Sequence, residues 1–123
     1  MYYSNVMVLQ SNPLAAQTVV SALGGSFYSV RVVRTLDELR AGIIRHRAEV
    51  VVLDMEVASI KALQRLCREF PHVTMVCTHR LADEEIWTSA LNAGAADVCA
   101  PSDTTAILQA ALRSSAALRK AAA

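Results

Sequence analysis

The sequence predicts an α/β fold in which five parallel strands, in the order 2-1-3-4-5, form one doubly wound sheet with helices on both faces. Short β-branched runs alternate with longer segments of helical periodicity along the whole chain, which is typical of βαβ units. The third of these runs, VVVL at 50–53, is apolar at every position. A central strand that is buried on both faces has this pattern.

The first half of the chain contains two strands and two helices with recognisable ends. The first strand is expected at 5–9 and the first helix at 13–23, since Pro13 suits a first helical turn and Gly24 favours an end. The second strand is expected at 29–33. Thr35 and Glu38 have capping-box spacing, so the second helix is expected to begin there and to run to about 46. Its predicted core-facing residues are Leu36, Leu39, Ile43 and Ile44.

The second half continues the alternation. The third strand ends at Asp54, and the third helix is expected at 59–69 because Pro71 disfavours helical conformation at Phe70. The fourth strand is expected at 73–77, followed by a helix that opens on the acidic turn 83–85. The fifth strand is expected at 96–99, and a last helix begins near Ser102 or Asp103. The inner stripe of that helix is predicted to be Ile107, Leu108, Ala111, Leu112, Ser115 and Leu118.

Length and composition indicate one globular domain, spanning 1–123, without room for an effector domain. The 123 residues are 54% hydrophobic and 19% charged, with a formal net charge of +1. The arginines are scattered rather than clustered, which argues against nucleic acid as a partner. No apolar run approaches bilayer-spanning length, so no membrane association is expected. Cys67, Cys77 and Cys99 are odd in number and lack CxxC spacing, which favours reduced thiols and a cytoplasmic location.

The predicted fold places a specific set of residues at its functional edge. In a doubly wound sheet, ligands bind in the crevice beyond the carboxyl ends of the strands. The residues that follow the first, third, fourth and fifth strands are therefore the candidates. They are Gln10, Ser11, Asp54, Thr78, Ala100 and Pro101.

Four features of this arrangement resemble the receiver domains of two-component response regulators, over essentially the full length of the chain. An aspartate closes an apolar third strand (VVVLD, Asp54), and a threonine closes the fourth (VTMVCT, Thr78). The fourth helix ends in NAGAADV at 92–98, and Pro101 follows the fifth strand. The resemblance implies a flavodoxin-like fold and a role in phosphorelay signalling.

The resemblance also implies roles for individual residues. Asp54 matches the phosphoacceptor, and Thr78 matches a switch hydroxyl that contacts the phosphate. The acidic pair that holds Mg²⁺ in the family is replaced by Gln10 and Ser11, and the phosphate-binding lysine is replaced by Ala100 or Pro101. Val98 stands where an aromatic switch residue is common, and the segment after Asp54 lacks the family's Met-Pro and Gly. These losses predict a degenerate receiver, or pseudo-receiver, with no metal, no cofactor and no enzymatic activity.

The sequence gives little support for a metal, nucleophile or nucleotide site of another kind. Glu56 offers a carboxylate near Asp54 that would be a partial substitute for a lost metal ligand, although an exposed Glu56 is the simpler reading. A zinc site or a Cys–His nucleophile built from Cys77, His79 and Cys99 has little support, because buried strand cysteines are usually core residues. A flavin or nucleotide site is disfavoured, since the QSNPLAA loop at 10–16 has no glycine.

The preferred function is that of a stand-alone receiver-like protein that acts by phosphorylation-independent protein contact. The alternative is a working receiver that is phosphorylated on Asp54 by a histidine kinase and binds Mg²⁺ at an altered site. The expected partner is another signalling protein or a second copy of the chain, bound on the face of the fourth helix, fifth strand and fifth helix. Trp87 and Leu91 mark that face. The sequence also allows the alternative that Trp87 packs over the helix edge as a core residue.

Overall fold

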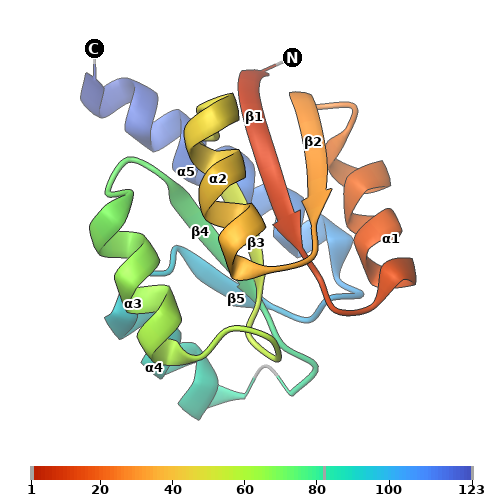
Figure 1. Cartoon of the computed structure of the whole chain (residues 1–123), viewed down its shortest axis with the longest axis vertical. Coiled ribbons are helices and arrows are strands. Elements are labelled where there is room, and N and C mark those ends of the chain that lie inside the picture. Colours follow the sequence, from red (N-terminus) through yellow and green to blue (C-terminus); the bar gives the residue numbers. More distant parts are fainter. Residues whose placement is uncertain (1, 82, 123) are drawn as a thin grey trace.

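The computed structural model describes the backbone of residues 2–81 and 83–122, and the side chains of residues 4–81 and 83–113. Strands and helices alternate throughout (Figure 1). The elements are β1 (Tyr2–Leu9), α1 (Pro13–Leu23), β2 (Phe27–Val33), α2 (Leu36–His46), β3 (Val50–Asp54), α3 (Ile60–Glu69), β4 (Thr74–Thr78), α4 (Glu84–Ala93), β5 (Asp97–Cys99) and α5 (Thr104–Ala122).

The strands form a five-stranded sheet in the order β2-β1-β3-β4-β5, and every pairing is parallel. The predicted fold class is therefore confirmed. Leu9 pairs with Leu53, and Asp54 pairs with Thr78, so the ends of β1, β3 and β4 lie level with one another. This register brings the residues that follow the strands to a common edge.

Helices cover both faces of the sheet, and each face has its own core. The helices α2, α3 and α4 pack against one face, where Leu39, Leu63 and Ala90 are fully buried. The helices α1 and α5 pack against the other face around Val19 and Ile107. Figure 1 shows α2 in front of the sheet and α5 behind it. Because successive strand residues point to opposite faces, the two cores are built on the same strands.

The local signals placed the helix starts well. Thr35, Ser59 and Asp83 are N-caps, whose side chains accept hydrogen bonds from the first-turn amides of α2, α3 and α4. The strand starts were less well predicted, since β1 begins at Tyr2 and β2 at Phe27. Polar Asn5 and Ser29 obscured the continuity of these strands. They are tolerated because the Ser29 hydroxyl donates to Asn5 Oδ1 at 2.6 Å.

Two core predictions need correction. Ile44 in α2 is 69% exposed, because the helix turns Leu39 and Ile43 inward and the adjacent position falls outside that stripe. In α5 the fully buried positions are Ile107, Ala110 and Ala111, so Ala110 was missed and Leu108 is only half-buried, as is Leu112. Ser115 and Leu118 lie outside the described side chains. Within the described part of the chain, no helix has the length and hydropathy needed to cross a membrane.

Candidate functional site

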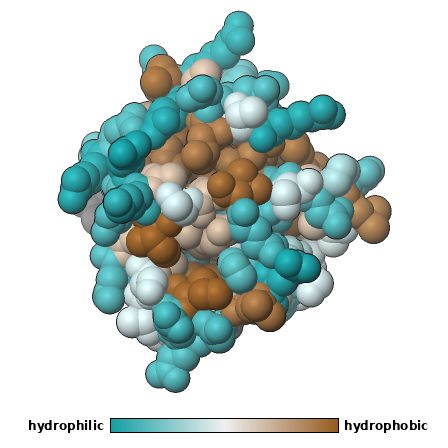
Figure 2. All heavy atoms as spheres, turned by 60° about the horizontal axis from the view of Figure 1, so that its bottom comes forward, coloured by the Kyte–Doolittle hydropathy of each residue, from teal (hydrophilic) through white to brown (hydrophobic). Residues whose placement is uncertain are grey.

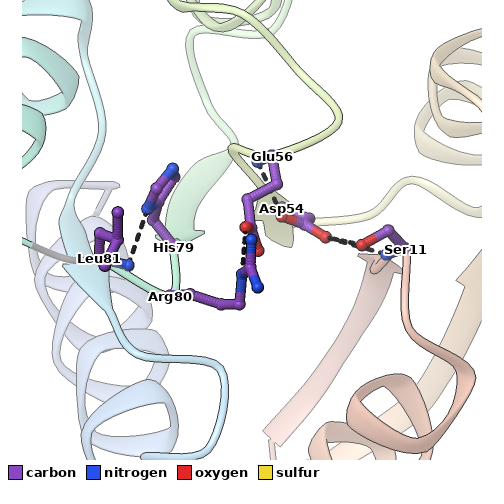
Figure 3. A network of polar contacts seen from close by, with 6 residues as sticks. All are labelled: Ser11, Asp54, Glu56, His79, Arg80 and Leu81. Carbon is purple, nitrogen blue, oxygen red and sulfur yellow. Dashed lines mark hydrogen bonds and ion pairs between the residues drawn. The ribbon is translucent and has the colours of Figure 1, made fainter.

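The carboxylate of Asp54 lies at the end of β3 and is only 3% exposed. Its Oδ2 accepts hydrogen bonds from the Ser11 amide at 2.9 Å and the Ser11 hydroxyl at 2.7 Å. Its Oδ1 accepts from the Glu56 amide at 2.8 Å. Figure 3 shows these contacts converging on Asp54 from both sides. Both carboxylate oxygens are therefore engaged by donors of the chain itself.

A second hydrogen bond crosses the same edge of the sheet. The Gln10 side-chain amide, just after β1, donates through Nε2 to Thr78 Oγ1 at 2.8 Å. Both side chains are buried, with exposures of 8% for Gln10 and none for Thr78. The bond links β1 to β4 across the end of β3. Gln10 thus contacts Thr78, and Ser11 contacts Asp54.

An ion pair closes the opposite side of the crevice. Arg80, in the loop between β4 and α4, places its Nε 2.5 Å from Glu56 Oε1 (Figure 3). The neighbouring His79 is turned away from this pair, and its Nδ1 accepts from the Leu81 amide at 2.9 Å. Sequence reasoning singled out Glu56 but missed Arg80. The available signal was a basic residue two positions after Thr78, on a loop at the functional edge.

These residues line a cavity of about 280 Å³ beyond the end of the sheet. The cavity brings together Gln10, Ser11 and Asp54, as predicted, and adds Glu56 and Arg80. Pro101 lines it as well, whereas Ala100 lines a neighbouring hollow with Leu14 and Arg80. Of the two candidate positions for the missing lysine, Pro101 is thus the one on the Asp54 cavity.

Apolar side chains are exposed on the first turn of α1 and on the segments that follow β3 and β4. Leu14 at the start of α1 is 75% exposed, Val57 after β3 is 43% exposed and Leu81 after β4 is 68% exposed. Figure 2 turns the carboxyl edge toward the reader and shows apolar surface interspersed with hydrophilic groups. Exposed apolar groups around a polar centre are a common property of protein-binding surfaces.

The donor set fits a magnesium ion poorly. Mg²⁺ prefers carboxylate and water oxygens in near-ideal octahedral geometry. Asp54 is the one carboxylate of the crevice cavity without a cationic partner, because Glu56 is paired with Arg80. The Gln10 amide nitrogen, rather than a carboxylate, points toward Thr78. No cluster of three or more His, Cys, Asp or Glu side chains suitable for a metal occurs among the residues that the structure describes.

The zinc and nucleophile hypotheses gain no support from the cysteines. Cys77 packs in the core beneath α2, α3 and α4, whereas Cys99 packs in the core beneath α1 and α5. The two thiols therefore lie on opposite faces of the sheet. Burial raises the pKa of Cys77 to about 12 and that of Cys99 to about 11, so neither thiol is ionised near neutral pH.

Trp87 is 45% exposed on α4, which settles against its placement in the core. Its Nε1 donates to Asp97 Oδ1 at 3.2 Å, and Arg113 Nη2 lies 3.7 Å from Asp97 Oδ2. These contacts connect α4, β5 and α5 across the predicted partner face. Leu91 is half-buried beside them, and Val98 is buried with 8% exposure.

This chain is similar to known proteins in fold but not detectably in sequence. A scan against protein-family models finds no match, and a comparison with curated proteins finds no related sequence. Solved structures, in contrast, match closely. The signal receiver domain of a response regulator from Bacteroides fragilis has a TM-score of 0.81 at 21% identity, covering 91% of this chain and 96% of that one.

Two further neighbours agree. A CheY-like receiver domain protein from Methanospirillum hungatei has a TM-score of 0.80 at 17% identity, with coverages of 96% and 98%. An orphan response regulator of H. pylori has a TM-score of 0.78 at 12% identity, with coverages of 90% and 95%. The chain therefore has the fold of receiver domains, including their strand order.

Proposed function

We propose that this chain is a receiver-type domain of two-component signalling that acts by binding another protein in the cytoplasm, independently of phosphorylation. The receiver fold and the positions of Asp54 and Thr78 at its carboxyl edge support the signalling context. One of the structural neighbours is described as an orphan response regulator. The fold by itself does not assign the function, so the proposal depends on the site.

The observation that carries the proposal is that donors of the chain itself, rather than a cation, engage both oxygens of the Asp54 carboxylate. A phosphoacceptor must offer an oxygen lone pair to the incoming phosphorus while cations absorb the developing charge. In this chain the Ser11 hydroxyl and amide both donate to Oδ2, and the Glu56 amide donates to Oδ1. Attack by Oδ2 would require breaking one of its two hydrogen bonds, and attack through the remaining lone pair of Oδ1 would proceed without help from a strongly held cation.

The cost of losing the acidic pair is large. A unit charge at about 4 Å contributes roughly 4 kcal/mol at an effective dielectric near 20. Half of that value, lost at each of the positions now occupied by Gln10 and Ser11, weakens metal binding by about a thousandfold. Glu56 does not compensate, because its carboxylate is held by Arg80. The site is thus better suited to a fixed structural carboxylate than to phosphoryl transfer.

The face formed by α4, β5 and α5 is the proposed contact surface. Exposed tryptophans are enriched among the residues that dominate binding energies at interfaces. The indole of Trp87 is already oriented by Asp97, which reduces the side-chain entropy that binding would remove. The partner is another signalling protein or a second copy of this chain.

Phosphorylation of the isolated protein tests the proposal directly. We expect acetyl phosphate and Mg²⁺ to add no phosphate mass to the natural chain, and Trp87 fluorescence not to respond to Mg²⁺ with beryllofluoride. The variant Gln10→Asp/Ser11→Asp restores the acidic pair and serves as the positive comparison, with Asp54→Ala as the blank. A phosphate mass on the natural chain that Asp54→Ala abolishes would show the proposal to be wrong.

The contact function requires a test in the organism, because the partner is not identified by the site. Transcript profiles would be compared between the natural strain, a deletion strain and strains carrying Asp54→Ala or Trp87→Ala. We expect Asp54→Ala to resemble the natural strain and Trp87→Ala to resemble the deletion. The reverse pattern, with equal amounts of folded protein, would contradict the proposal.

One observation favours the alternative of a working phosphoacceptor. Arg80 lines the same cavity as Asp54, and so brings a positive charge to a site that lacks the usual lysine. If Arg80 released Glu56, its guanidinium would be available to a phosphoryl group. Under this alternative, Arg80→Ala would abolish a phosphate mass that the natural chain acquires.

A further inference from the structure

A second, larger cavity lies outside the crevice around Asp54. It has a volume of about 590 Å³ and lies between α1 and the edge strand β2. The residues that line it come from the end of β1, the outer side of α1 and the end of β2. They are Gln10, Ser11, Pro13, Ala16, Gln17, Val20, Val32 and Arg34.

The interior of this cavity is apolar and partly open. Ala16 is buried, Val20 is half-buried and Val32 remains 47% exposed although it lies on a strand. Val32 is accessible because β2 is an edge strand, so that only β1 pairs with it. An apolar ligand here would remove these groups from water, at roughly 25 cal/mol for each Å² of apolar surface covered.

The charge at the mouth of the cavity has one sign. Arg34 is the only charged residue among those that line the cavity. Its guanidinium forms no ion pair with another residue that the structure describes. Glu38 accepts from the Arg34 backbone amide at 3.0 Å and does not line the cavity. A carboxylate is the natural partner of a free guanidinium.

From this combination we propose that the cavity binds a small amphipathic anion, with an apolar body against Ala16, Val20 and Val32 and a carboxylate at Arg34. The volume lies within the usual range of about 300–1,000 Å³ for sites that hold one small molecule. The amides of Gln10 and Gln17 and the hydroxyl of Ser11 supply additional polar groups at the rim.

The site has a direct connection to the crevice, because Gln10 and Ser11 line both cavities. Gln10 donates to Thr78 and Ser11 donates to Asp54. A ligand that displaces either side chain acts on those two hydrogen bonds. Occupancy of the α1–β2 cavity is thus transmitted to Asp54 and Thr78 without any covalent modification. This inference goes beyond the proposed function and does not depend on it.

The test uses decanoate as the probe and the full chain, below the concentration at which decanoate forms micelles. Titration is followed by NMR of the valine methyl groups and the glutamine side-chain amides. We expect saturable shifts at Val20, Val32 and Gln10. Decanol lacks the charge and acetate lacks the apolar body, so decanol should bind at least tenfold more weakly and acetate should cause no saturable shift.

Matched variants separate a specific site from general adsorption. Arg34→Gln should weaken decanoate binding at least tenfold. Arg31→Gln, which removes an exposed arginine of β2 that does not line the cavity, should leave binding unchanged. Gln17→Trp, at an exposed helix position, should fill the cavity and abolish the shifts while the protein stays folded by circular dichroism.

Four outcomes would overturn the proposal. The first is the absence of saturable shifts, and the second is an equal loss of affinity in Arg31→Gln and Arg34→Gln. The third is a set of shifts centred on the other large cavity, near Ile43 and Phe70. Sedimentation of the natural chain completes the test, because a dimer that decanoate dissociates would show that a second copy covers this cavity instead.

Discussion

The residues at positions 10 and 11 each satisfy a buried polar group at the carboxyl edge of the sheet. A buried carboxylate or hydroxyl without a partner costs about 1–3 kcal/mol. Asp54 and Thr78 would carry that cost if no donor lay beside them. Ser11 and Gln10 avoid it, since each supplies a donor to one of these two acceptors. These hydrogen bonds therefore stabilise the carboxyl edge of the sheet.

Ser11→Ala tests this role of the serine hydroxyl. The substitution removes the 2.7 Å bond to Asp54 Oδ2 but keeps the backbone amide bond to the same oxygen. We expect a loss of roughly 1–2 kcal/mol in the free energy of unfolding, measured with urea. Ser102→Ala, at an exposed loop position, should change it by less than about 0.5 kcal/mol. Equal effects of the two substitutions would show that the hydroxyl is not needed.

The cysteines give a second prediction at the residue scale. A free thiol titrates near 8.5, whereas burial raises the pKa of Cys77 to about 12 and of Cys99 to about 11. A raised pKa reduces the thiolate fraction, so we expect both thiols to react far more slowly with Ellman's reagent at pH 8 in the native protein than in the unfolded chain. Because Cys67 is only half-buried, the measurement uses a Cys67→Ala background, in which fast native labelling would contradict the burial of Cys77 and Cys99.

Among the elements, helix starts were predictable and strand starts were not. A helix start depends on a local signal, and Thr35, Ser59 and Asp83 each accept from an amide within the first turn. A strand start depends on its neighbour. Asn5 and Ser29 interrupt the apolar pattern, but they are hydrogen-bonded to each other and the pairing of β1 with β2 extends beyond them to Tyr2 and Phe27.

The end of α4 depends on a glycine that both conformation and packing require. Gly94 has φ = +116°, and a Cβ at this position would lie 2.8 Å from Cys67 Sγ. Gly94→Ala should lower the free energy of unfolding by about 2–4 kcal/mol, since the positive φ and the overlap each contribute. Gly25→Ala is the matched control, because a Cβ there meets nothing within 4 Å.

A double variant separates the two contributions at Gly94. Gly94→Ala in a Cys67→Ala background retains the unfavourable φ but relieves the contact with sulfur. We expect the cost of Gly94→Ala to fall by at least about 1 kcal/mol in that background, measured by thermal or urea unfolding. An unchanged cost would assign the whole effect to the backbone conformation.

At the scale of the whole molecule, the sequence predicted those residues whose positions are set by the sheet. Alternation of elements and the strand-end positions of Gln10, Ser11, Asp54 and Thr78 were enough to bring these residues to one edge. Arg80 and the α1–β2 cavity were missed. Their positions depend on loop conformation and on how far α1 stands from an edge strand, and neither leaves a periodic pattern in the sequence.

The shared strands also determine how the molecule unfolds. Val50 and Val52 of β3 belong to the core beneath α1 and α5, while Val51 and Leu53 belong to the core beneath α2, α3 and α4. Neither core can be lost without disrupting the strand that supports the other. We therefore expect a single cooperative transition in urea, with the same midpoint by Trp87 fluorescence and by far-UV circular dichroism.

Two fully buried leucines, one in each core, test this cooperativity. Leu63→Ala and Leu23→Ala should each cost about 2–5 kcal/mol. Each should also move both probes together, although Trp87 lies on α4, on the same face of the sheet as Leu63 and opposite Leu23. If Leu23→Ala shifted the circular dichroism transition but left the Trp87 transition in place, the two faces would be separate folding units, and coupling between the α1–β2 cavity and the rest of the molecule would have to remain local.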